Sequence, residues 1–186
     1  MKKTARASGI ILSLGLAAWL MAGSHRSRAD DKDKERPAIP PEMKVLEKRI
    51  GAWTTLTRAK PAEWTPDGFE NKGDEKIELV LQGRFIQGKV RTQPGNVEAI
   101  WLATYDVNKK AYRVWYFSSQ GDIVESGGKW DAESNTMTWR DNPQPGVTSV
   151  AHWRFRSVDS FEWDLVAKDA GGKVYLDMAG KLTRKK

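Results

Sequence analysis

From Gly51 to the end of the chain, apolar and polar residues alternate almost everywhere with a period of two. In the segment KIELVLQ at residues 76–82, for example, Ile77, Leu79 and Leu81 occupy every second position. Such alternation predicts β-strands with one buried face and one solvated face. Short polar turns interrupt it about every 8 to 12 residues, which is the spacing typical of sandwiches and barrels.

About ten such strands are expected, so we predict an all-β fold in which an antiparallel meander closes into a barrel. The first strand follows Gly51, and the others are expected at residues 76–82, 84–92, 97–105, 111–118, 123–130, 136–140, 149–156, 161–167 and 174–183. No alternation of strands with helices is visible, which argues against a parallel sheet. A β-sandwich or a small propeller remains the alternative architecture.

A short amphipathic helix is predicted before the first strand, beginning near Glu42. Met43, Leu46 and Ile50 have helical spacing, and Gly51 is placed to end the helix. The longest connection is expected at residues 60–73, and it carries the large aromatic side chains of Trp64 and Phe69. Long loops in compact domains often cover binding sites, so these two residues are candidates for guarding a cavity mouth.

The first 29 residues differ from the rest of the chain. A basic start is followed by an apolar run at residues 9–23, and small residues at Ser27 and Ala29 have the spacing of a cleavage site. We predict a signal peptide at residues 1–29, a charged, proline-rich flexible linker at 30–41 and one domain at 42–186. An uncleaved N-terminal anchor is the alternative. Export would place the mature protein in the periplasm or outside the cell.

Charge gives little sign of a nucleic-acid partner. The whole chain has a net charge of +7, but five basic residues and no acidic ones lie in residues 1–29. The remainder carries 26 basic and 24 acidic residues, a net charge of only +2. This is not the clustered basic face that a nucleic-acid-binding domain requires. No membrane span is expected after residue 29, and the absence of cysteine leaves the core alone to stabilise the domain.

The order of helix, Gly51-x-Trp53 and meander resembles the calycin superfamily, which includes lipocalins, fatty-acid-binding proteins and nitrobindin-like barrels. The resemblance implies that Trp53 plugs the closed end of the barrel. It also implies that a basic residue near the end of the last strand, Lys181 or Arg184, packs across the indole ring. A cation over an indole face contributes about 0.5–2 kcal/mol.

A closer resemblance spans residues 42–184. The succession LEKRIGAW, LQGRF, YDVNKKAYRVW, GGKWDAESNTMTW and GKVYLDMAGKLTR is similar to a family of uncharacterised exported bacterial proteins, known as a domain of unknown function with a calycin-like barrel. This resemblance implies a fold and an export route. It brings no established activity and no catalytic residue.

The residues offer little for catalysis, and we expect a protein that is not an enzyme. After residue 29 the chain has one histidine, His152, and no cysteine, so a zinc site is not expected and cofactors are predicted to be absent. Nitrobindin-like barrels hold haem through a histidine, which makes His152 a possible haem ligand if its strand face points inward. If the face with Trp153 and Phe155 points inward instead, His152 is exposed.

Tryptophan is the strongest compositional signal, because eight of the nine tryptophans follow residue 29. A ten-stranded barrel is wider than the eight-stranded barrels that side chains just fill. We therefore predict an aromatic-lined cavity for a small apolar or amphipathic ligand; a filled interior, or exposed aromatics that stack on sugars, are the alternatives. The candidate ligand-binding residues are Trp64, Phe69, Trp101, Arg113, Trp115, Tyr116, Trp139, Trp153, Arg154 and Trp163, with Arg113, Tyr116 and Arg154 proposed for a ligand carboxylate.

Overall fold

The computed structural model of the chain describes residues 38–186, which form one compact unit. The predicted signal peptide, residues 1–29, lies outside the described residues, as does most of the predicted linker at 30–41.

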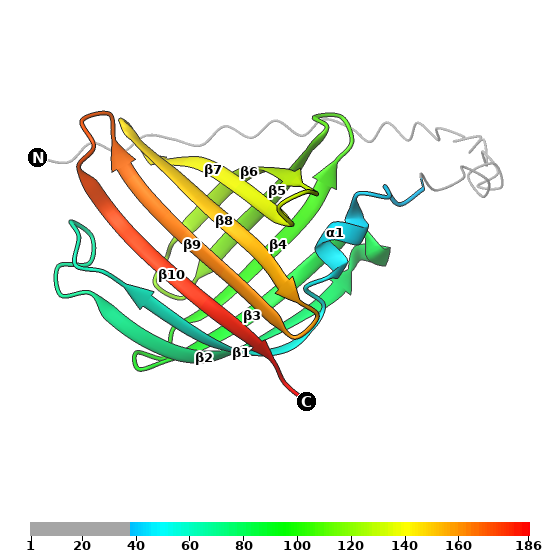
Figure 1. The fold of residues 1–186 in the computed structure, drawn as a ribbon, viewed down its shortest axis with the longest axis horizontal. Coiled ribbons are helices and arrows are strands. Elements are labelled where there is room, and N and C mark those ends of the chain that lie inside the picture. Colours follow the sequence, from blue (N-terminus) through cyan, green and yellow to red (C-terminus); the bar gives the residue numbers. More distant parts are fainter. Residues whose placement is uncertain (1–37) are drawn as a thin grey trace, which may run out of the picture. The chain divides into compact units, whose positions relative to one another are not determined.

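Ten strands form one closed antiparallel barrel (Figure 1). Each strand pairs with its neighbours in the sequence, and β1 closes the circle by pairing with β10. The strands are β1 (Gly51–Ala59), β2 (Phe69–Val80), β3 (Phe85–Gln93), β4 (Glu98–Asp106), β5 (Ala111–Ser118), β6 (Ile123–Asp131), β7 (Thr136–Gln144), β8 (Val147–Ser157), β9 (Ser160–Asp169) and β10 (Val174–Arg184). The predicted meander barrel of about ten strands is confirmed, and a sandwich or propeller is excluded.

The one α-helix of the described residues, α1 (Met43–Glu47), covers one end of the barrel (Figure 1). Its apolar side chains Met43 and Leu46 are fully buried, and Tyr112 on β5 donates a hydrogen bond to the carbonyl of Glu42 at 3.1 Å. We call this end the helix end; it also carries the short 3₁₀ helix η1 (Leu81–Gly83) between β2 and β3. The opposite end, the mouth, carries the β1–β2, β3–β4, β5–β6, β7–β8 and β9–β10 connections.

Three inward tryptophans each lie over a glycine on the neighbouring strand. The cross-strand pairs are Trp101 with Gly88, Trp139 with Gly128 and Trp163 with Gly180. A Cβ atom at any of these glycines would collide with the indole ring. The aromatic ring shields the bare backbone of the glycine, and the glycine leaves room for the ring to lie flat against the barrel wall. The glycines therefore fix where the large side chains sit.

Two connections differ from the sequence-based expectation. β2 begins at Phe69, so the long loop ends five residues earlier than predicted, because FENKGD pairs in register with β1 despite its low strand propensity. β7 continues past the predicted end at Arg140 to Gln144. Its register shifts between Asp141 and Gln144, and such an irregularity tolerates Pro143 in a strand.

Candidate functional site

The helix end is closed by Trp53, which is fully buried. The guanidinium carbon of Arg184 lies 4.2 Å from the Trp53 ring centre, and its Nη1 donates a hydrogen bond to the carbonyl of Ile50 at 2.7 Å. Gly51 has a φ of +140°, and a Cβ atom there would collide with Arg184. Of the two basic residues predicted to cross the ring, Arg184 occupies the position. Lys181 does not, because its register places it on the outer face, opposite Glu162 on β9.

A buried ion pair forms the floor of the barrel interior. Arg49 follows α1, and its Nη2 lies 2.9 Å from Glu75 Oε2 on β2; the two residues are only 4% and 5% exposed. The second carboxylate oxygen, Oε1, accepts a hydrogen bond of 2.6 Å from Trp101 Nε1. Burial lowers the pKa of the Arg49 guanidinium, and the attraction of Glu75 opposes that effect.

The Arg49 guanidinium is also surrounded by aromatic rings. Its carbon lies 4.6 Å from the ring centre of Trp101, 4.3 Å from that of Trp153 and 4.4 Å from that of Phe161. Trp153 in turn makes an edge contact with Trp139, with ring centres 4.8 Å apart. The cation thus ties strands β4, β8 and β9 together beneath the interior.

Above this floor the burial of the larger inward side chains decreases. At the helix end the inward side chains are fully buried, as for Ile77, Ile86, Met137, Phe161 and Leu182. Toward the mouth most of the larger inward side chains are only partly buried, namely Thr57, Asn71, Tyr116, Trp163, Leu165 and Met178. We call this less completely buried part of the interior, between the aromatic floor and the mouth, the chamber.

Several polar atoms in the interior have no hydrogen-bond partner within the protein. They are Arg49 Nε, Thr55 Oγ1, Trp139 Nε1 and Asp141 Oδ1, and all four atoms are buried. The other carboxylate oxygen of Asp141 accepts a hydrogen bond of 2.6 Å from Ser126 Oγ. Tyr116 also faces the chamber, and its pKa is raised by burial, with the carboxylates of Asp122 and Glu75 adding to the effect. Unpartnered buried polar atoms are costly unless water or a ligand satisfies them.

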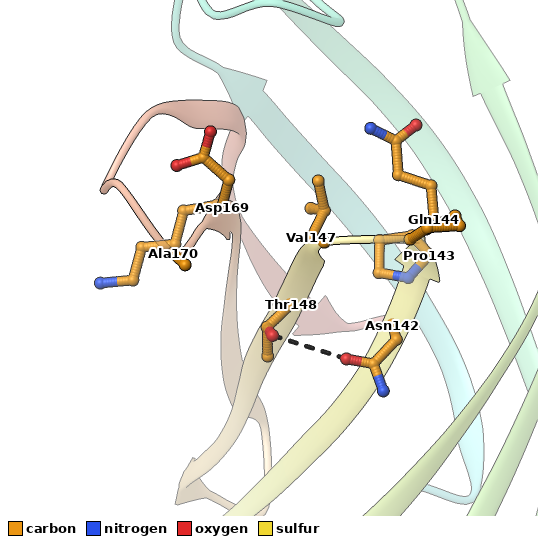
Figure 2. A pocket seen from close by; sticks show the side chains of 10 residues that line it. Asn142, Pro143, Gln144, Val147, Thr148, Asp169 and Ala170 are labelled. Carbon is orange, nitrogen blue, oxygen red and sulfur yellow. Dashed lines mark hydrogen bonds between the residues drawn. The ribbon is translucent and has the colours of Figure 1, made fainter.

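A hollow of about 970 Å³ lies at the rim of the mouth. It is lined by residues 142–148 of the β7–β8 hairpin and residues 168–170 at the β9–β10 turn. Figure 2 shows Val147 between these two segments, with Thr148 donating a long hydrogen bond of 3.5 Å to Asn142. The lining of the hollow includes Asn142, Thr148 and Lys168, which alternate along their strands with inward residues.

The structure brings six of the ten candidate ligand-binding residues to the interior. Their register or burial places the following side chains inward: Phe69 at the rim, and Trp101, Tyr116, Trp139, Trp153 and Trp163 along the wall. The face of β5 with Tyr112, Val114 and Tyr116 is the inner one, a question that the sequence left open.

Three candidates need correction because they lie on the outer face of the barrel. Arg113 forms an ion pair with Glu125, and Trp115 lies near Phe85, with ring centres 6.4 Å apart. Arg154 pairs with Asp164 at 2.9 Å on the outer face of β8 and β9. Arg113 and Trp115 share a strand face that is both aromatic and basic, so alternation alone did not distinguish inside from outside there, whereas Arg154 lies on the polar face of β8, opposite Trp153 and Phe155.

Trp64 belongs to the β1–β2 loop, which is attached to β10 rather than free. The amide of Lys60 donates to the carbonyl of Asp177 at 2.9 Å, and the amide of Trp64 donates to that of Tyr175 at 2.9 Å. The rings of Trp64 and Tyr175 pack with centres 5.5 Å apart. Trp64 therefore lies beside the mouth and braces the wall.

His152 is on the outer face, so the inward orientation that would have made it a possible haem ligand is not found. Its Nδ1 lies 3.0 Å from Asp164 Oδ2, beside Arg154. Burial opposes ionisation of Asp164, yet hydrogen bonds from Arg154 and His152 outweigh it and lower the pKa of the carboxyl. A haem in the chamber could not use His152 as its axial ligand. Among residues 38–186 no cluster of three or more His, Cys, Asp or Glu side chains could hold a metal ion.

Sequence reasoning missed three charged residues of the interior: Arg49, Glu75 and Asp141. For Glu75 and Asp141, the sequence contained a pattern that could have identified them. Glu75 falls in the same alternating series as Ile77, and Asp141 in that of Met137 and Trp139, so each is a charge on an otherwise apolar strand face. Arg49 lies between helix and strand, where no periodicity assigns a face. Within the described part of the chain, no helix has the length and apolar character to cross a membrane.

Comparisons with known proteins agree with this fold. Residues 40–164 match a family described as "Protein of unknown function (DUF1579)". No curated protein matches the sequence. The crystal structure of Rv2717c from M. tuberculosis is similar over 80% of this chain and 100% of that chain, with a TM-score of 0.59 and 13% identity. The S-type phycobiliprotein lyase CPES from Guillardia theta is similar over 77% and 92%, with a TM-score of 0.53 and 14% identity. At these identities the likeness shows the fold alone.

Proposed function

We propose, for a chain that belongs to the DUF1579 family of proteins of unknown function, that its role is to bind a small, largely apolar or amphipathic ligand inside the barrel. The observation that carries the proposal is the contrast along the interior. The inward side chains at the helix end are fully buried, whereas most of the larger ones toward the mouth keep accessible surface.

The chamber has the composition that such a ligand requires. Trp153, Trp163 and Leu165 face inward along its walls, and the partly buried polar side chains of Asn71 and Tyr116 can fix orientation. A ligand that removes about 200 Å² of apolar surface from water gains roughly 5 kcal/mol before the costs of association. That gain is enough for a useful affinity when one or two hydrogen bonds add to it.

We propose binding without catalysis and without a resident cofactor, and a site of action outside the cytoplasm. The apolar segment at residues 9–23 supports export. Cell fractionation of the natural host with an antibody to the barrel tests the location, and recovery from the cytoplasm alone would contradict it.

The test of binding uses a neutral fluorescent probe, N-phenyl-1-naphthylamine, titrated into the full chain while energy transfer from tryptophan is followed. Ala151→Phe adds a ring to the chamber wall between Trp139 and Leu165. We expect it to weaken probe binding about tenfold or more, because the added ring takes up the volume that the probe occupies. The matched control is Val150→Phe, which adds the same ring one residue away on the outer face and should leave the affinity unchanged.

Two outcomes would contradict the proposal. Equal weakening by both substitutions would indicate that the probe does not enter the barrel. Absence of saturable binding by the unmodified chain, for this probe and for a panel of lipids and flat aromatic compounds, would favour the filled barrel. Thermal unfolding of both variants shows that any loss of binding occurs in a folded protein.

A further inference from the structure

We propose that the outer face of strands β4, β5 and β6 is the contact surface of a homodimer, in which a second copy of this chain packs against the first. The sequence suggested Trp115 as part of a cavity wall, whereas the strand pairing places its side chain on this outer face. The inference does not depend on what the interior binds.

A row of large apolar side chains crosses the outer face near the mouth. Ile100 on β4 pairs with Phe117 on β5, and Phe117 pairs with Ile123 on β6. These three residues are 43%, 40% and 75% exposed. Residues that are paired across neighbouring strands lie close enough for their side chains to touch, so the three form one continuous apolar surface.

A second row, one step toward the helix end, widens this surface. Leu102 on β4 pairs with Trp115 on β5, and the Trp115 ring lies near that of Phe85 on β3. All three are partly exposed. We call the two rows together the outer apolar patch: Phe85, Ile100, Leu102, Trp115, Phe117 and Ile123. Single exposed apolar residues are ordinary, but a contiguous group of this kind marks a contact site.

The two flanks of the patch carry opposite charges. Lys89 on β3 pairs with Ile100 on one flank, and Asp122 immediately precedes Ile123 on the other. Both side chains are exposed, and neither forms an ion pair with another residue of the range 38–186. Ser118 Oγ donates a hydrogen bond of 2.6 Å to the Asp122 carboxylate and holds it in place.

The other charged residues beside the patch are already paired within the chain. Arg91 contacts Glu98, and Arg113 contacts Glu125. Lys76 on β2, which pairs with Lys89 across the sheet, contacts Glu78. One cation on the β3 flank and one anion on the β6 flank therefore remain for a partner to balance.

A second copy supplies that balance through two-fold symmetry. An axis parallel to the strands, between β4 and β5, places the β3 flank of each copy against the β6 flank of the other. Lys89 of one copy then lies toward Asp122 of the second, and the same contact occurs twice, because a two-fold interface repeats each pair. An anionic membrane surface would attract Lys89 but repel Asp122, so the charges favour a protein partner with this same pattern.

The dimer is expected to be weak. The wall of a barrel is convex, so two such walls touch over less than the roughly 800 Å² per partner of a standard interface. An apolar centre with one charge pair on each side is still the usual anatomy of a specific contact. We expect a dissociation constant of about 1–100 µM.

Sedimentation velocity of the full chain over about 1–300 µM tests the inference, and we expect a shift from monomer to dimer in that range. Ile123→Asp places a charge in the most exposed part of the patch, beside Asp122, and should weaken association about tenfold or more. The matched control is Val158→Asp in the β8–β9 turn, where the replaced residue is 78% exposed and lies outside the patch. It should leave association unchanged.

A second pair of variants tests the charges. Lys89→Glu would bring a like charge toward Asp122 of the other copy and should weaken association about three- to tenfold, with a smaller effect at high salt. Lys109→Glu makes the same change at an exposed lysine between β4 and β5 and should have no effect. Thermal unfolding checks that each variant is folded, and if Ile123→Asp does not fold, the two lysine variants still decide.

Three outcomes would overturn the inference. One is a chain that stays monomeric over the whole range, whether or not it sediments with phosphatidylglycerol vesicles. Another is association that Ile123→Asp and Val158→Asp leave equally strong, as association through the apolar segment at residues 9–23 would be. The third is equal behaviour of Lys89→Glu and Lys109→Glu at low salt, which is incompatible with the two-fold arrangement.

Discussion

The two ends of the barrel interior differ in how completely their inward side chains are buried and in how their charged groups are paired. At the helix end the charges are paired: Arg49 with Glu75, Glu75 with Trp101, and Arg184 with the carbonyl of Ile50. Among the buried atoms that lack a hydrogen-bond partner are Arg49 Nε at the floor, and Trp139 Nε1 and Asp141 Oδ1 further along β7. A buried polar group that is satisfied contributes to a unique fold, and one that is not satisfied costs stability unless something binds to it. The buried ion pair and the complete burial at the helix end stabilise the barrel, and the lower burial toward the mouth supports the proposed ligand site there.

The largest effect should come from breaking the ion pair at the floor. Glu75→Gln keeps an oxygen for Trp101 but removes the negative charge opposite Arg49, which leaves a buried cation uncompensated. We expect the free energy of unfolding to fall by about 3–5 kcal/mol. Chemical denaturation followed by tryptophan fluorescence measures it. Glu78→Gln, at a more exposed position of the same strand, should leave the free energy of unfolding nearly unchanged. Similar values for the two variants would contradict a structural role for the floor.

A second comparison uses two inward residues of one strand. Phe161 on β9 is fully buried at the helix end, and Leu165, four residues along, is partly buried at the chamber. Phe161→Ala should cost about 3–4 kcal/mol, because it leaves a closed cavity. Leu165→Ala should cost about 1 kcal/mol, since the space it vacates opens onto the chamber.

The same denaturation measurement, with the N-phenyl-1-naphthylamine titration beside it, tests this contrast. For Leu165→Ala, the free energy of probe binding should change more than the free energy of unfolding. For Phe161→Ala, the free energy of unfolding should change more. Equal losses of stability at the two positions would show that the interior is packed along its whole length.

The sequence predicted the strand order and the plug, but not which face of some strands lies inside the barrel. The alternation and the turn spacing were enough to predict the meander, and the Gly51-x-Trp53 pattern pointed to the plug, because both depend on local order in the chain. The inner face of a strand such as β5 was not predictable, since Arg113 and Trp115 alternate with Val114 and Tyr116 and both faces are amphipathic. Only the pairing of β5 with β4 and β6 decides which face is inside.

The candidate site was harder to predict for a related reason. Asp141 lies in DNPQPG, a segment with the composition of a turn, and its place in the wall of the chamber depends on the irregular pairing of β7 with β8. Its hydrogen-bond partner Ser126 lies 15 residues earlier in the chain, and no sequence motif identifies that serine. Long-range pairing of this kind is not encoded in any local pattern, although a charge in phase with Met137 and Trp139 was a visible hint.

The smallest of the three effects should come from the plug, which distinguishes the two basic residues near the C-terminus. Arg184→Ala removes the cation from the face of Trp53 and the hydrogen bonds to the carbonyls of Ile50 and Val158. We expect a loss of about 1–2 kcal/mol, since the side chain is partly exposed and its contacts are partly replaced by water. Lys181→Ala removes a cation of the same strand from the outer face and should cost less than about 0.5 kcal/mol. Probe affinity should not change in either variant, because the plug lies at the helix end, on the other side of the aromatic floor from the chamber. A loss of probe binding in Arg184→Ala without a loss of stability would mean that the two ends of the barrel are not independent, and the division of roles between them would have to be abandoned.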